Sequence, residues 1–202
     1  MIRHLRFTLY TLLFAGLAPS AAVVAQDRAE SLAGKLLVAA PSMPDPRFQK
    51  TVIYMCLHDR SGALGLIVNR RMGEVPASAV AEQFGLDAKP SADTVRLHWG
   101  GPVEPGRGFV LHSSEYQSES TEPVGPGIAF SVDNAILSDL VSGAGPERVL
   151  LVLGYSGWGA GQLESELKRD DWLVVPADAA FVFDEDFEGL WEAALERVEV
   201  DL

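Results

Sequence analysis

The sequence predicts an α+β fold in a single domain. The chain has 202 residues, of which 48% are hydrophobic and 22% charged, an ordinary globular mixture. Its predicted strands gather in hairpins and do not alternate regularly with helices, which favours α+β over a doubly wound parallel sheet. A helical period of 3.6 residues is clearest near the C-terminus, at Phe187, Leu190, Trp191, Ala194, Leu195 and Val198.

The sequence predicts the following elements along the chain. Strands are expected at residues 35–40, 51–58, 63–69, 95–99, 108–112, 128–132, 148–153, 172–175 and 179–183. Helices are expected at residues 29–33, 77–84, 133–142, 162–169 and 187–198. The hairpin of residues 51–58 and 63–69 is the clearest, because Asp59-Arg60-Ser61-Gly62 supplies turn chemistry. The prolines of residues 41–46 indicate a loop, and residues 154–161 are predicted as a glycine-rich turn.

The charge and the cysteine count exclude several classes of partner. The chain holds 28 acidic and 16 basic residues, for a formal net charge of -12. We expect no nucleic acid partner, because that average field repels a polyanion and no basic patch interrupts it. One cysteine excludes an intramolecular disulfide framework and a four-cysteine metal site. We expect no metal and no cofactor.

Residues 1–25 are predicted to be a secretory signal peptide, which leaves residues 26–202 as the domain. Two arginines precede an apolar run at residues 7–17, Pro19 breaks the run, and small residues follow as far as Ala25. No other stretch approaches the roughly 20 apolar residues of a membrane span. We therefore expect an exported, periplasmic protein with no stable membrane span after cleavage. The alternative is an uncleaved segment or a misassigned start, and a cytoplasmic protein.

Ser156 is the first candidate for chemistry. Gly154-Tyr155-Ser156-Gly157 resembles a strained turn before a helix, but a nucleophile elbow needs glycine where this chain has Trp158, and no histidine follows. The glycines would also suit an anion at the helix start near Gln162, although neither dinucleotide nor Walker spacing is met. The favoured interpretation is structural, with glycines that permit a tight turn and let Trp158 pack on the backbone.

Cys56 and His58 are the second candidate, and Asp45 is the third. Two residues apart on a strand, Cys56 and His58 are expected on the same face, with His98 and His112 near the ends of later strands. A metal needs three or four convergent ligands, so a buried thiol beside a strand-end histidine is favoured. Asp45 is expected to cap neighbouring amides. The acidic residues 115–122 and 184–188 indicate solvated surface, or a docking face for a basic partner.

Four separated motifs resemble those of a known family. They are Leu36-Leu37-Val38-Ala39 with Pro41-Ser42-Met43 and Asp45-Pro46-Arg47-Phe48; Thr51-Val52 with His58 and residues 62–70; Gly100-Gly101-Pro102-Val103 with residues 108–112; and residues 154–159 with Gly161-Gln162-Leu163-Glu164 and Trp172. In this order, across residues 36–195, they resemble the AlgH/YqgE family. Four motifs together are far more specific than one.

The resemblance implies a fold and leaves the activity open. It implies one α+β domain whose bifurcated, mostly antiparallel sheet forms a pseudo-barrel flanked by helices. Members are regarded as regulators, named for an effect on alginate production, with no established enzyme activity and an undefined molecular function. They are expected to be cytoplasmic and to begin near Leu36, so the leader sets this protein apart and argues against a direct transcriptional role.

We therefore expect a non-catalytic binding or regulatory protein. A groove would take an unidentified small ligand or protein partner. Its expected lining is Pro41, Met43, Asp45, Phe48, Asn69, Gly100, Gly101, Pro102, His112, Ser156, Trp158 and Gln162. The alternative is an uncharacterised hydrolase or thiol enzyme, in which Ser156 or Cys56 is the nucleophile and His58 or His112 the base. A third interpretation is a purely structural assembly subunit.

Overall fold

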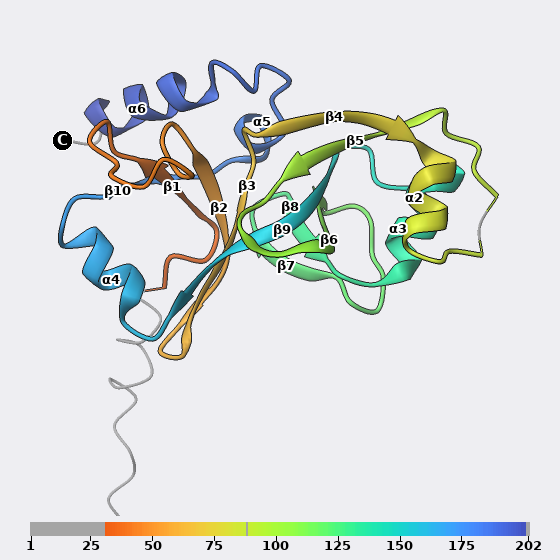
Figure 1. Ribbon diagram of the computed structural model, residues 1–202, viewed down its shortest axis with the longest axis horizontal. Coiled ribbons are helices and arrows are strands. Elements are labelled where there is room, and N and C mark those ends of the chain that lie inside the picture. Colours follow the sequence, from red (N-terminus) through yellow and green to blue (C-terminus); the bar gives the residue numbers. More distant parts are fainter. Residues whose placement is uncertain (1–30, 88, 201–202) are drawn as a thin grey trace, which may run out of the picture. The chain divides into compact units, whose positions relative to one another are not determined.

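The computed structural model describes residues 31–87 and 89–200 (Figure 1). The predicted signal peptide lies outside the described residues, as does the start of the helix predicted at residues 29–33, whose described part is not helical. The helices are α2 (Ala77–Gln83), α3 (Asn134–Ser142), α4 (Gln162–Leu167), α5 (Ala179–Val182) and α6 (Leu190–Val200). The strands are β1 (Lys35–Ala39), β2 (Val52–Asp59), β3 (Gly62–Ile67), β4 (Arg71–Pro76), β5 (Thr94–Trp99), β6 (Val103–Ser113), β7 (Glu122–Gly125), β8 (Ile128–Ser131), β9 (Val149–Gly159) and β10 (Trp172–Pro176).

The sheet is organised around β9, because this strand has neighbours from three parts of the sequence. The strand order is β10-β1-β2-β3-β9-β6-β8-β7, with β4 and β5 as a branch. Along one edge, β6 pairs with β9 from Tyr155 back to Val149. The other edge is shared, since β3 pairs with residues 156–159 and β5 pairs in parallel with residues 151–153. The sheet therefore forks at Gly154, which confirms the bifurcated and mostly antiparallel architecture.

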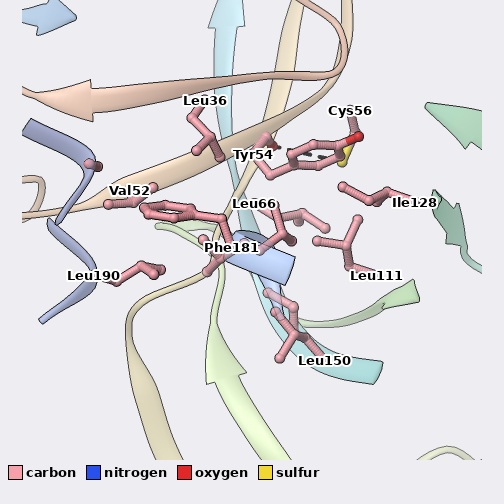
Figure 2. Close-up of a cluster of buried hydrophobic side chains, with 14 of the residues drawn as sticks. Leu36, Val52, Tyr54, Cys56, Leu66, Leu111, Ile128, Leu150, Phe181 and Leu190 are labelled. Atoms are coloured by element: carbon pink, nitrogen blue, oxygen red, sulfur yellow. Dashed lines mark hydrogen bonds between the residues drawn. The ribbon is translucent and has the colours of Figure 1, made fainter. Parts of the chain in front are cut away.

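Alternate residues of each strand face different layers of core, as the pleat of a strand requires. Leu36 and Val38 of β1 belong to a central cluster, whereas Leu37 and Ala39 belong to a second cluster beneath Leu163 of α4. A third cluster lies between the sheet and helices α2 and α3. Strands on both sides of β9 contribute to the central cluster, β1, β2, β3 and β10 on one side and β6 and β8 on the other, so the sheet curls around it. Figure 2 shows members of this cluster, including Leu36, Val52, Tyr54, Leu66, Leu111, Ile128, Leu150, Phe181 and Leu190.

Local signals in the sequence explain several elements. The hairpin of β2 and β3 is confirmed, and Asp59 accepts a hydrogen bond from the Ser61 amide in its turn (2.7 Å). Helix α3 begins at a cap in which Asp133 accepts from the amide of Ile136 (3.0 Å). It ends at Gly143, whose φ of 77° suits a glycine at a helix C-terminus. The predicted last helix is confirmed as α6.

The prediction of a glycine-rich turn at residues 154–161 is wrong. Strand β9 continues through these glycines to Gly159, with Ser156 and Trp158 buried and Gly157 and Gly159 exposed. Close approach within the sheet explains Gly154, because a Cβ there would lie 2.6 Å from the Gly101 carbonyl oxygen. The backbone turns only after Gly159, just before α4.

Two further predictions need correction. Residues 179–183, predicted as a strand, contain the single turn of α5, because Asp178 caps it by accepting from the Phe181 amide (2.9 Å). Strand β4 was not predicted. It pairs with β5 alone and is largely exposed, so it lacks the apolar alternation that marks a half-buried strand. Within the described ranges, no helix has the length and apolar character needed to cross a membrane.

Candidate functional site

Motif residues that are distant in sequence meet beneath α4. Met43, Trp158 and Trp172 are buried in the second cluster, and the half-buried Phe48 packs against it. The Phe48 ring lies edge-on to Trp172, with centroids 5.6 Å apart. Trp158 in turn lies edge-on to Trp172 at 6.0 Å. The structure thus joins the first and last motifs in one aromatic cluster.

The carboxylate of Glu166 connects α4 to this cluster through hydrogen bonds. Its Oε2 accepts hydrogen bonds from the indole nitrogens of Trp158 (2.8 Å) and Trp172 (2.9 Å). Its Oε1 accepts from Gln162 (3.0 Å), whose own side-chain oxygen accepts from the Gly159 amide (3.1 Å). Glu166 is not among the residues that the sequence motifs single out. The available signal is indirect: two tryptophans in the motifs each need an acceptor for the indole N–H if they are buried.

Asp45 and Asn69 hold the loop between β1 and β2. Asp45 accepts from the Arg47 amide (2.9 Å), which confirms the predicted cap, and pairs with the Arg47 guanidinium (2.6 Å). The hydrogen bond to Arg47 is the main reason that the pKa of Asp45 lies below its usual value. Asn69 donates to the Lys50 carbonyl (2.9 Å) and accepts from the Val52 amide (2.8 Å). The loop is therefore fixed by side chains from both of its sides.

Gly100, Gly101 and Ser156 lie at the fork of the sheet. The Gly100 carbonyl accepts from the Ser156 hydroxyl (3.0 Å) and from the Ile67 amide (3.1 Å). Gly101 has a φ of 147°, and a Cβ there would lie 2.3 Å from the backbone of Tyr155. Ser156 is fully buried. These residues hold the two branches together, and Ser156 acts through its hydrogen bond to the backbone.

His112 lies apart from the other predicted lining residues. It pairs with Val149 at the start of β9, nine residues from Trp158, or about 30 Å along an extended strand. Burial is the main cause of the lowered pKa of His112, so the ring is neutral at pH 7. Its Nδ1 then donates to the Ser113 carbonyl and its Nε2 accepts from the Ser131 hydroxyl, both at 3.0 Å.

The prediction that Cys56 and His58 share a face is wrong. A β-bulge interrupts the β2–β3 register between Met55 and Leu57, so His58 pairs with Ala63 on the face of the second cluster. Cys56 lies in the central cluster instead, and burial raises the pKa of its thiol. The His58 ring accepts from the Leu32 amide (3.0 Å) and contacts Glu164 (3.1 Å). This thiol and this histidine therefore cannot act as a pair.

His98 makes stability depend on pH. The ring is fully buried and edge-on to Phe187 (4.7 Å), and burial lowers its pKa from 6.5 to about 4. Between these values the unfolded protein takes up a proton that the folded protein excludes, so stability falls as the pH falls. From about pH 7.5 to about pH 5, we expect this histidine to remove about 2 kcal/mol from the free energy of unfolding.

Urea unfolding of the wild type and of His98→Leu at both pH values measures this effect. The variant should lack that share of the pH dependence, while other titrating groups, including His112, contribute equally to both proteins. Equal losses in the two proteins would show that His98 is not the cause.

Comparisons with known proteins agree with this architecture. The solution structure of the AlgH protein from Pseudomonas aeruginosa has a TM-score of 0.71 and 42% identity, over 83% of this chain and 89% of that one. A crystal structure of a protein from Corynebacterium diphtheriae, 21% identical, shares the fold with a TM-score of 0.66 over 83% and 87%. The protein thus has the AlgH-like α+β fold, a single domain whose mostly antiparallel sheet curls into a half-barrel with short helices.

Sequence relatives give the family. A UPF0301 protein of Rhodospirillum rubrum is 46% identical over 84% of this chain and 88% of its own length. A UPF0301 protein of Cereibacter sphaeroides is 42% identical over 84% and 93%. The AlgH-like (DUF179) family model matches residues 36–202. The chain belongs to the AlgH-like UPF0301 family, whose molecular function is uncharacterised.

Proposed function

We propose that this protein is a non-catalytic binding or regulatory protein that recognises a small ligand or protein partner. The contact surface, called here the motif surface, consists of the predicted lining residues that are at least partly exposed. These are Pro41, Asp45, Phe48, Asn69, Pro102 and Gln162. Buried residues from the same motifs, Met43 and Trp158, support it from below.

The observation that carries this proposal is the fixed position of Phe48. Its half-buried ring rests on Trp172, and the loop that bears it is held by Asp45 and Asn69. An aromatic side chain held in place before binding loses little conformational entropy when a partner arrives. Such a partly exposed anchor suits recognition.

The partners of the candidate catalytic groups favour binding over the alternative of a hydrolase or thiol enzyme. The Ser156 hydroxyl donates to the Gly100 carbonyl, and the Cys56 thiol is buried beside the Tyr54 carbonyl (3.9 Å). Both ring nitrogens of His112 have hydrogen-bond partners. A catalytic base needs to lie within hydrogen-bond reach of its nucleophile. The described geometry offers these groups structural roles instead.

The proposal also covers the cellular compartment of the protein and the class of its partners. The net charge of -12 supports function without nucleic acid. Export to the periplasm follows if residues 1–25 are cleaved, and a cytoplasmic protein if they are retained. The intact mass of the protein from its native host decides between these.

Phe48→Ala tests the motif surface. A panel of nucleotides, amino acids and organic acids is screened for a rise in melting temperature, with Leu57→Ala as control because Leu57 is also an exposed apolar residue (52%) but lies outside the motif surface. At least one compound should stabilise the wild type and the control but fail with Phe48→Ala. If every stabilising compound acted equally on all three proteins, this surface would be excluded. Turnover of any compound, abolished by Ser156→Ala or Cys56→Ala, would establish an enzyme.

A further inference from the structure

A cleft opens between β5 and β9, outside the motif surface. The two strands are paired only at residues 97–99 and 151–153. Before that point β5 remains paired with β4, up to Thr94 opposite Pro76, while β9 remains paired with β6, up to Val149 opposite His112. The strands diverge because they follow different neighbours. The resulting cleft has a volume of about 330 Å³, the size of a small-molecule site.

Arg96 lines this cleft with an incompletely satisfied guanidinium. Both of its terminal nitrogens lie 3.4 Å from a carboxylate oxygen of Glu185, and its Nε lies 4.0 Å from Glu74. The Nε is buried and has no hydrogen-bond partner among the described residues. Well-formed bonds between guanidinium and carboxylate are about 2.7–2.9 Å long. Since the Glu185 side chain is 82% exposed, it is free to leave Arg96 for solvent.

Arg148 contributes a second guanidinium to the same cleft. Its central carbon lies 5.4 Å from the centre of the Phe183 ring. Across residues 31–87 and 89–198, no carboxylate forms an ion pair with it and its guanidinium makes no hydrogen bond. One arginine with only long carboxylate contacts and one with no carboxylate partner in the described part of the chain therefore line the same small space.

The rest of the lining restricts the ligand that these arginines accept. Apolar side chains of Val95, Leu140, Leu151 and Phe183 suit a short hydrocarbon group. Glu74, Glu147 and Glu185 also line the cleft, so its acids outnumber its two arginines and oppose a dianion such as phosphate. A monocarboxylate adds only one negative charge to this acidic lining, and its two oxygens match the planar donor geometry of a guanidinium.

We propose that the cleft between β5 and β9 binds a small monocarboxylate that carries a short apolar group. The carboxylate takes the place of Glu185 on Arg96 and contacts Arg148, and the apolar group lies against Leu140 and Phe183. Glu185 acts as an internal competitor. This site is independent of the motif surface, so Phe48→Ala should leave it unchanged.

Titration of the 15N-labelled full-length protein with sodium hexanoate, at constant ionic strength, tests the site. Amide resonances of Val95, Arg96, Val149 and Leu151 should shift with a millimolar dissociation constant. Arg148→Gln should weaken binding roughly tenfold, as expected for a lost charged hydrogen bond. Glu185→Gln should tighten it several-fold, because the competing charge is gone. Arg107→Gln is the matched control: Arg107 also lies over a phenylalanine ring, at 5.0 Å from Phe109, but outside the cleft.

Each outcome of this titration either supports or overturns the proposal. Unchanged binding in Arg148→Gln, no gain in Glu185→Gln, or equal shifts with hexylamine or inorganic phosphate would each overturn the proposal. N-acetyl-leucine presents the same carboxylate on a peptide-like body. Tighter binding of N-acetyl-leucine than of hexanoate assigns the ligand to the C-terminus of a peptide, and the reverse assigns it to a free acid. The variants alter exposed side chains, and unshifted resonances elsewhere verify that they remain folded.

Discussion

Gly101→Ala should lower the free energy of unfolding by more than about 3 kcal/mol. Two costs combine at this position: a φ of 147° that side chains rarely adopt, and a Cβ placed 2.3 Å from the backbone of Tyr155. The atom it would meet belongs to β9 at the fork, so relief requires movement of a strand that both branches share. Urea unfolding followed by circular dichroism measures the loss.

Two other glycines separate these costs. Gly73 has a φ of 140°, and no atom lies within 4 Å of the position that a Cβ would take, so Gly73→Ala reports backbone strain alone. Gly106 has neither constraint, so Gly106→Ala should change stability by no more than about 0.5 kcal/mol. If Gly101→Ala cost no more than Gly73→Ala, close approach at the fork would be irrelevant to stability.

Glu166→Ala should destabilise the protein by about 3 kcal/mol, because it leaves two buried indole N–H groups without their acceptor. Glu166→Gln keeps one acceptor oxygen, so its loss should be roughly half as large. The readout is tryptophan fluorescence during urea unfolding, since Trp158 and Trp172 are the residues affected.

Glu164→Ala is the control on the same helix. Glu164 is a half-exposed carboxylate whose contact is with His58, and exposed pairs contribute at most about 1 kcal/mol. A Glu166→Ala protein as stable as this control would mean that α4 is held by apolar packing alone.

Local chemistry made much of the fold predictable. The turn after β2 and the cap of α3 each depend on residues within a few positions, so the sequence displays them directly. The four motifs made the sheet architecture and the family predictable as well, because they lie in order along nearly the whole domain. The role of Asp45 as a local cap was equally accessible.

Features that depend on distant partners were not predictable in this way. The glycines of β9 have the composition of a turn, and only their neighbours on β3 and β6 make them a strand. The bulge at Cys56 places His58 on the opposite face of the strand, and no residue type in this segment signals a bulge. Glu166 and the cleft beside Arg96 likewise depend on which strands meet, which composition and spacing do not specify.

The position of β9 also constrains the order in which the molecule assembles. Its partners β3, β5 and β6 precede it in the sequence, some by almost a hundred residues. As the ribosome releases the polypeptide, neither branch is complete until residues 149–159 emerge. Early intermediates would therefore expose strand edges of β3 and β5 together, and closure of both would be a single late event in biosynthesis.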